Sequence, residues 1–161
     1  MWVYKKNHSG VANATYADLA SYLNLYINFK LKVIDARSMG LDADTAYKAE
    51  INGYERALKA QKKASPKNLE YAYIMNEYRE GVLMFNISEK KIWSKAWDNE
   101  SKLREFHNAN ASKYSNKAFD EVRGQVIADY QQSLENEWIK ILRTKYTVKI
   151  NDDELRHLAK L

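Results

Sequence analysis

The chain has 161 residues, 45% hydrophobic and 29% charged, and it contains five Gly, one Pro and no Cys. Average usage would give about eleven Gly and about eight Pro. This shortage of turn formers argues against an all-β sandwich or barrel, whose strands need a turn about every eight to twelve residues. The absence of Cys excludes disulfide bonds, thiol catalysis and the usual zinc modules. No apolar run reaches about eighteen residues, so we expect no integral membrane segment.

Lys and Arg outnumber Asp and Glu by 26 to 21, which gives a net charge of +5 and an isoelectric point near 9.2. Such a balance indicates a nucleic-acid partner only where the charge gathers on one face. Here basic and acidic residues alternate, as in Asp120-Glu121-Val122-Arg123. The tightest basic group is interpreted as a solvated helix end with its linker; it comprises Lys59, Lys62, Lys63 and Lys67. We therefore expect no nucleic acid, and a basic nucleic-acid-binding helical protein is the weakest alternative.

The first helix is predicted between Thr15 and Gly40. Thr15-Tyr16-Ala17-Asp18 has the spacing of a capping box, with Asp in place of the usual Glu or Gln. Gly40 is typical of the residue that ends a helix. Apolar residues at spacings of three and four predict one buried stripe, formed by Tyr16, Leu19, Leu23, Ile27, Leu31 and Ile34.

A second helix is expected after Asp42, and it ends before Ser65-Pro66 because the residue before Pro disfavours the α conformation. The N-terminal helices thus occupy residues 15–63, a break lies near residues 64–68, and a C-terminal helical part fills residues 69–161. All of this is expected to form a single domain of about six to seven helices over residues 1–161. We expect no secretion signal in Met1–Lys6, because these residues have no apolar core.

The C-terminal part opens with a helix from Leu69 that contains a kink near Gly81. Ser88 is predicted to cap a new short helix, and another short helix follows with His107 on its surface. The longest helix is expected from Lys117 to Lys145, followed by a short extended piece and a helix from Asp152. The apolar seam of the longest helix repeats every three or four residues and contains Phe119, Val122, Val126, Tyr130, Leu134, Trp138 and Leu142.

Residues that could carry catalysis are few. The three histidines, His8, His107 and His157, lie far apart in the sequence, and none stands beside a carboxylate at metal-ligand spacing. No Gly-rich phosphate loop, nucleophile elbow or zinc motif occurs. We therefore expect a protein that is not an enzyme, with no catalytic residue, no metal and no cofactor.

Aromatic residues are the distinctive feature, with twelve Tyr, four Trp and four Phe. The simpler interpretation places them in a helical core, with hydroxyl and indole groups at its wet edge. The alternative is a groove for unfolded or extended polypeptide, since aromatic and Met side chains contact apolar segments without requiring one sequence. The candidates for that groove are Tyr22, Tyr26, Tyr71, Tyr73, Met75, Trp93 and Trp97.

Three stretches carry a family resemblance. Residues 22–33 (YLNLYINFKLKV), followed by Ala36 and Gly40-Leu41-Asp42, resemble the N-terminal helical segment of SurA-like periplasmic peptidyl-prolyl isomerases. Residues 77–89 (EYREGVLMFNISE), with Ile92-Trp93, resemble the segment that follows the parvulin domain in that family. Residues 124–131 (GQVIADYQ), with Glu137-Trp138 and Leu142-Arg143, are similar to its closing long helix.

The chain departs from that family between the first two stretches. The family has one or more parvulin domains there, whereas this chain has only the region around residues 64–70. The isomerase residues have no counterpart, so none is carried over. The resemblance implies an all-α chaperone core in the periplasm: an ATP-independent holdase that binds unfolded envelope or outer-membrane polypeptides. A second hypothesis is a helical dimerisation or assembly module, with a homodimer completing the burial of the long seam.

Overall fold

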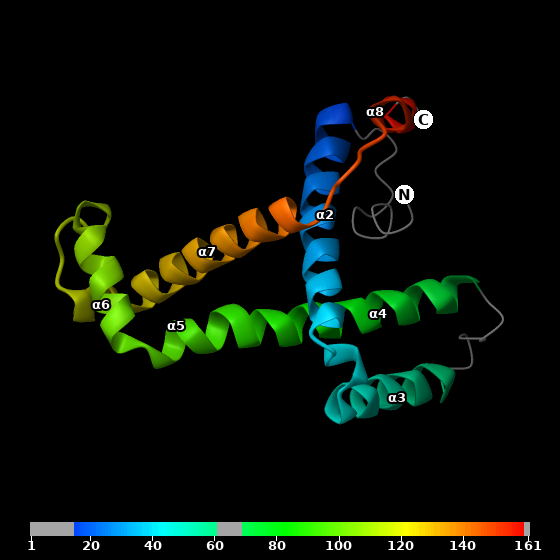
Figure 1. Cartoon of the computed structure of the whole chain (residues 1–161), viewed down its shortest axis with the longest axis horizontal. Coiled ribbons are helices and arrows are strands. Elements are labelled where there is room, and N and C mark those ends of the chain that lie inside the picture. Colours follow the sequence, from blue (N-terminus) through cyan, green and yellow to red (C-terminus); the bar gives the residue numbers. More distant parts are fainter. Residues whose placement is uncertain (1–14, 61–68, 160–161) are drawn as a thin grey trace.

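A computed structural model describes residues 15–60 and 69–159. Every regular element in these two ranges is a helix, and neither contains a strand, so the all-α prediction is confirmed (Figure 1). The predicted break at Ser65-Pro66 lies outside the described residues, as do Met1–Lys6 and three of the four clustered lysines. The described helices are arranged around two crossing rods, with α2 passing across α4.

The first rod, α2 (Tyr16–Ser38), begins and ends where the sequence predicts. Asp18 N–H bonds to the Thr15 hydroxyl at 3.2 Å, and the Asp18 carboxylate accepts the Thr15 N–H at 3.1 Å, which completes the capping box. Gly40 takes a left-handed φ of 73°, a conformation that glycine adopts without steric cost. The chain then turns through η1 (Leu41–Ala43) into α3 (Thr45–Ala60).

The second rod is one continuous helical path made of α4 (Leu69–Ser88), the π-helical turn η2 (Glu89–Trp93) and α5 (Ser94–Asp98). Helical bonding runs through Gly81 without interruption. The prediction that Ser88 caps a new helix is wrong, because Ser88 has helical dihedral angles (φ −66°, ψ −42°) and its side chain caps nothing. Its buried hydroxyl instead donates to Met84 Sδ at 3.6 Å, one turn earlier in the same helix.

The chain then reverses through α6 (Glu100–Ala109) and η3 (Ala111–Tyr114) into the longest helix, α7 (Phe119–Lys145). His107 was expected on the surface of α6, but it is buried. Its ring stacks on Tyr114 at 5.3 Å, and its Nε2 lies 3.0 Å from the carbonyl oxygen of Lys117. The η3 turn therefore folds back over His107 and removes it from solvent. Residues 147–150 have no helical assignment, and α8 (Asp152–Leu158) follows.

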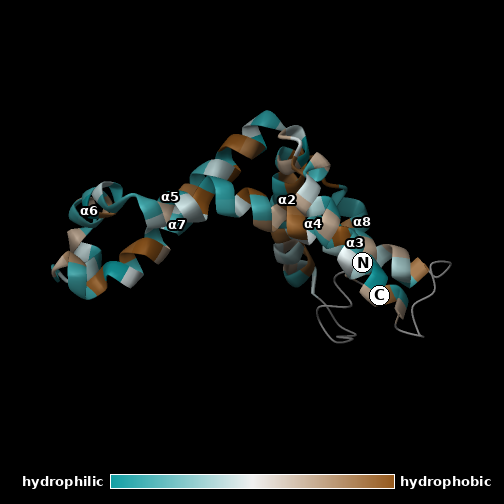
Figure 2. Ribbon diagram, turned by 90° about the horizontal axis from the view of Figure 1, so that it is seen from below, coloured by the Kyte–Doolittle hydropathy of each residue, from teal (hydrophilic) through white to brown (hydrophobic). Residues whose placement is uncertain are grey.

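Buried apolar residues form two main clusters. The larger lies where α2, α3, α4, η2 and the second half of α7 meet, and Figure 2 shows hydrophobic residues gathered where α2 crosses α4. The second cluster joins α6, η3 and the first half of α7 at the far end of the rod. The seam of α7 contributes to both, with Val126 in one and Trp138 and Leu142 in the other. The long seam is therefore covered by helices of the same chain.

Two buried carboxylates join the helices at the crossing. Asp35 on α2 accepts hydrogen bonds from Lys91 Nζ at 2.6 Å and from Trp138 Nε1 at 3.0 Å. Glu80 on α4 pairs with Lys30 Nζ at 2.5 Å and with an Arg37 guanidinium nitrogen at 3.6 Å. Because a buried charge is stable only when it is paired, these contacts hold α2 at one angle to α4 and α7.

Candidate functional site

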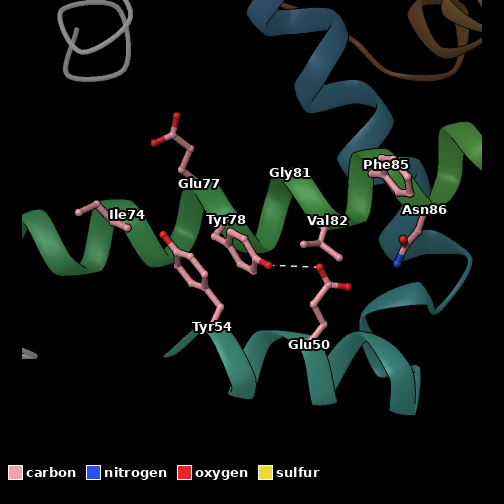
Figure 3. A pocket seen from close by; sticks show the side chains of 9 residues that line it. All are labelled: Glu50, Tyr54, Ile74, Glu77, Tyr78, Gly81, Val82, Phe85 and Asn86. Carbon is pink, nitrogen blue, oxygen red and sulfur yellow. Dashed lines mark hydrogen bonds between the residues drawn. The ribbon is translucent and has the colours of Figure 1, made fainter. Parts of the chain in front are cut away.

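An open groove of about 510 Å³ lies between α3 and α4 (Figure 3). Helix α3 contributes two side chains to it and α4 contributes the rest of the lining. The lining residues are Glu50 and Tyr54 from α3, and Ile74, Glu77, Tyr78, Gly81, Val82, Phe85 and Asn86 from α4.

The spacing of these residues follows from helix geometry. Ile74, Tyr78, Val82 and Phe85 recur at intervals of four, four and three, so they share one face of α4. Glu50 lies one turn before Tyr54 on α3. Helix α3 is fixed to the core by its own apolar residues, Tyr47, Ile51 and Leu58, which are buried in the larger cluster. The two helices therefore present a mixed aromatic and polar face between them.

A pair of stacked tyrosines bridges the two helices inside the groove. The rings of Tyr54 and Tyr78 are nearly parallel, with centroids 3.6 Å apart and an angle of 6° between their planes. The Tyr78 hydroxyl lies 3.2 Å from Glu50 Oε1 and donates to it, as Figure 3 shows. Burial and the neighbouring Glu50 carboxylate raise the pKa of the Tyr78 phenol above its ordinary value. Tyr78 therefore remains a protonated donor at neutral pH.

Phe85 forms the exposed apolar end of the groove. Its side chain is 52% exposed, and its ring meets the Trp93 ring edge-on at 4.9 Å. Large apolar side chains are scattered singly on most protein surfaces. At Phe85 the exposed ring lies instead beside a second aromatic residue and at the margin of a concave surface, an arrangement typical of sites that bind apolar ligands.

The groove offers groups that can bind a ligand. Its apolar walls can cover a side chain, and the Asn86 amide can both donate to and accept from a peptide backbone. Across residues 15–60 and 69–159, no cluster of three or more metal-ligating side chains occurs. Among the helices in those ranges, none combines the length and apolar character needed to cross a membrane.

The structure brings one of the aromatic candidates from the sequence, Trp93, to this groove, through its contact with Phe85. Met75 and Tyr71 lie in the core of the larger cluster, and the Tyr71 hydroxyl donates to Glu55 at 2.8 Å. Because both side chains are buried, neither is available as a direct contact for a bound polypeptide.

The other four candidates lie on separate surfaces. Tyr73 on α4 and Trp97 on α5 are exposed, at 42% and 59%. Tyr22 packs in a small cluster that joins α2 to α8. Tyr26 stacks on Phe29 of its own helix with ring centroids 6.1 Å apart. The seven candidates therefore do not form one surface.

Three aromatic residues of the groove, Tyr54, Tyr78 and Phe85, were missed as site candidates. Tyr54 and Tyr78 belong to stripes that predict a core face, and only the α3–α4 packing shows that these stripes end at an open edge.

Comparison with protein-family models, with curated proteins and with solved structures finds no match to this chain. The groove and its chemistry therefore carry the functional argument.

Proposed function

We propose that this protein is an ATP-independent chaperone, a holdase that binds exposed apolar segments of unfolded envelope or outer-membrane polypeptides. The groove between α3 and α4 is the binding site. The observation that carries the proposal is the half-exposed Phe85 ring at the end of an open groove whose wall is a stacked tyrosine pair. The resemblance to SurA-like chaperones supplies the class of client and a periplasmic location.

The character of the groove favours an unfolded polypeptide over a small-molecule ligand. The groove is open, and aromatic surfaces accept many apolar side chains in many orientations. Further exposed apolar rings, Tyr73 and Trp97, lie on the same rod and provide additional weak contacts. Several weak contacts along one chain raise the overall affinity without a specific sequence. Each contact is expected to be weak alone, because ordering a flexible client opposes binding.

The proposed activity is binding alone, related to peptidyl-prolyl isomerases but without their catalytic domain. A single domain that holds clients requires neither cofactor nor metal. The partner is an unfolded or extended polypeptide, and the proposal includes no nucleic acid.

The assembly hypothesis loses its original support. It was based on the long seam of α7, and the seam residues Val126, Trp138 and Leu142 are buried against other helices of the same chain. A homodimer remains an alternative partner, and light scattering at high protein concentration tests it. A monomer at every concentration would remove that alternative.

The first prediction concerns aggregation of a denatured outer-membrane protein diluted into buffer. The unmodified protein is expected to suppress light scattering at a near-stoichiometric ratio. The variant Phe85→Ser is expected to need about five times more protein for the same suppression. It removes the most exposed apolar surface of the groove, which contributes about 1 kcal/mol of binding free energy when half of the ring is covered.

The matched control is Ile141→Ser, which removes an exposed apolar residue from α7, outside the groove. Ile141→Ser is expected to leave suppression unchanged. No suppression by the unmodified protein at tenfold excess would contradict the chaperone proposal. Equal losses in the two variants would contradict the placement of the site in this groove.

A further inference from the structure

Gly81 leaves an opening in the α4 wall of the groove. Helical bonding continues through this residue, and its φ is not in the left-handed region that favours glycine. Within the described residues, a Cβ added at Gly81 would meet no atom within 4 Å beyond its chain neighbours and its own helix backbone. Neither the backbone conformation nor close packing inside the chain therefore requires glycine here, although glycine weakens a helix interior relative to alanine.

Gly81 is one corner of a hole on the face of α4 that lines the groove. The hole is formed by four lining residues at positions i, i+3, i+4 and i+7 of the helix, namely Tyr78, Gly81, Val82 and Phe85 (Figure 3). Four residues in this arrangement surround the hole that receives one side chain of a partner in knobs-into-holes packing. Because glycine has no side chain, the hole is open at this corner and has room for a large side chain.

The chemistry of this hole is apolar. The side chains of Val82 and Phe85 contain only carbon and hydrogen, and the Phe85 ring is half exposed. The polar atom of the third side chain, the Tyr78 hydroxyl, already donates to Glu50 at 3.2 Å. A charged or amide side chain in the hole would lose water without gaining a partner, whereas a large apolar side chain would gain by covering these carbon atoms.

We propose that the groove holds its client through one large apolar side chain, such as Leu or Phe, that enters the hole over Gly81. Gly81 is then the residue that sets the size of the side chain that the groove accepts. This inference rests on the proposed chaperone function and specifies which client segments the site selects. A segment with a single large apolar residue among polar ones is sufficient, and a segment whose apolar residues are all Ala binds poorly.

The first measurement compares two fluorescent peptides of ten residues on the unmodified protein. The central residue is Leu in one peptide and Ala in the other, and all remaining residues are polar, so that no second apolar side chain can enter the hole. The Leu peptide is expected to bind about five- to tenfold tighter. Leu buries about three more carbon groups than Ala, and about half of their transfer free energy is realised at an open site.

The variant Gly81→Leu fills the hole from the helix itself. Because the space at Gly81 is open and Leu favours a helix over Gly, this variant is expected to unfold at a higher urea concentration than the unmodified protein. Its preference for the Leu peptide should nevertheless fall below about twofold, since the added side chain occupies the space that the peptide would fill. If Gly81→Leu fails to fold, Gly81→Ala replaces it, with a smaller loss of preference.

The matched control is Gly124→Leu on α7. Within the described residues, Gly124 is also a helical glycine with no atom within 4 Å of an added Cβ, and it is exposed and lies outside the groove lining. This control should gain stability for the same reason and keep the preference for the Leu peptide. A purely structural role of Gly81 would change stability in both variants and the preference in neither.

The outcomes separate this inference from the proposed function. Equal binding of the two peptides, or an unchanged preference in folded Gly81→Leu, overturns the role of the hole, while suppression of client aggregation would still support the chaperone function. An equal loss of preference in Gly124→Leu overturns it too. If neither peptide binds a protein that still suppresses aggregation, the hole alone is refuted. If neither peptide binds and aggregation is not suppressed, the proposed function itself is refuted.

Discussion

Asp35 shows how a single side chain fixes the crossing of three elements. It extends from α2 and accepts hydrogen bonds from Lys91 of η2 and Trp138 of α7, while Lys145 Nζ lies 3.5 Å from its other oxygen. Burial raises the pKa of this carboxyl, but the hydrogen bonds from Lys91 and Trp138 and the charges of Lys91 and Lys145 outweigh burial and lower it below the ordinary value. The ionised form therefore stabilises the fold.

A prediction at this scale concerns pH. Because the pKa of Asp35 is lower in the folded chain than in the unfolded chain, its contribution is fully present above the unfolded value, about 3.9, and is lost as pH falls through the folded value. At neutral pH, Asp35→Asn should lower the free energy of unfolding in urea by about 2 kcal/mol. The difference between the two proteins should narrow below about pH 4.

The control is Glu137→Gln, a substitution at an exposed position on the same helix as Trp138. It should lower the free energy of unfolding by less than about 0.5 kcal/mol. A stability difference between Asp35→Asn and the unmodified protein that stays constant from neutral pH to pH 3, a pH chosen below the unfolded pKa, would contradict this role of Asp35.

At the scale of elements, the π-helical turn η2 is the irregular part of the long rod. The N–H of Ser94 bonds to the carbonyl of Glu89, five residues earlier, which is the π pattern. Such a turn corresponds to one extra residue inserted into an α-helix. The π turn lies where Lys91 bonds to Asp35 and where Ile92 is buried in the core. The extra residue therefore changes which face of the second rod points toward α2 and α7 at this contact.

The corresponding prediction is that the rod tolerates a deletion at η2 better than α7 tolerates one. Removing exposed Lys90 converts the π turn to regular α-helix. This deletion should lower the free energy of unfolding by about 2 kcal/mol or less, because the helical segments on either side keep the same faces toward the core. Removing exposed Gln132 from α7 rotates Trp138 and Leu142 out of the core. This deletion should lower the free energy of unfolding by more than about 5 kcal/mol.

Urea unfolding measures both deletions, and circular dichroism checks that the Lys90 deletion stays helical. A Lys90 deletion as damaging as the Gln132 deletion would show that the π turn is not a simple insertion.

At the scale of the whole molecule, the chain is an elongated frame in which η2 and α5, the continuation of α4, run beside α7 and lead into α6 (Figure 1). One cluster surrounds the crossing of α2 with α4, and the other occupies the far end of the frame. Helix α3 packs along α4 below this crossing, as Figure 1 shows, and the groove lies between them. The core thus stabilises the frame, and the groove lies on one of its outer faces.

Local signals in the sequence predicted much of this frame. The capping box at Thr15, the glycine at Gly40 and the seam of α7 act within one or two helical turns, and the structure agrees with all three. Ser88 was misassigned because serine is common at helix starts, whereas its burial on the rod depends on tertiary packing. The groove was not predictable from the sequence, since Tyr54 and Tyr78 look like core residues until the angle between α3 and α4 is known.

The most direct test of the central claim, that the groove between α3 and α4 holds unfolded polypeptide, is site-specific photo-crosslinking. A photoreactive residue replaces Phe85 in one protein and Ile141 in another, and each is irradiated with an unfolded outer-membrane protein. Both positions are exposed, at 52% and 63%, so solvent access does not favour the groove. We predict strong crosslinks to the client from position 85 and few from position 141. Equal yields from both positions, or crosslinks from position 141 alone, would contradict this account.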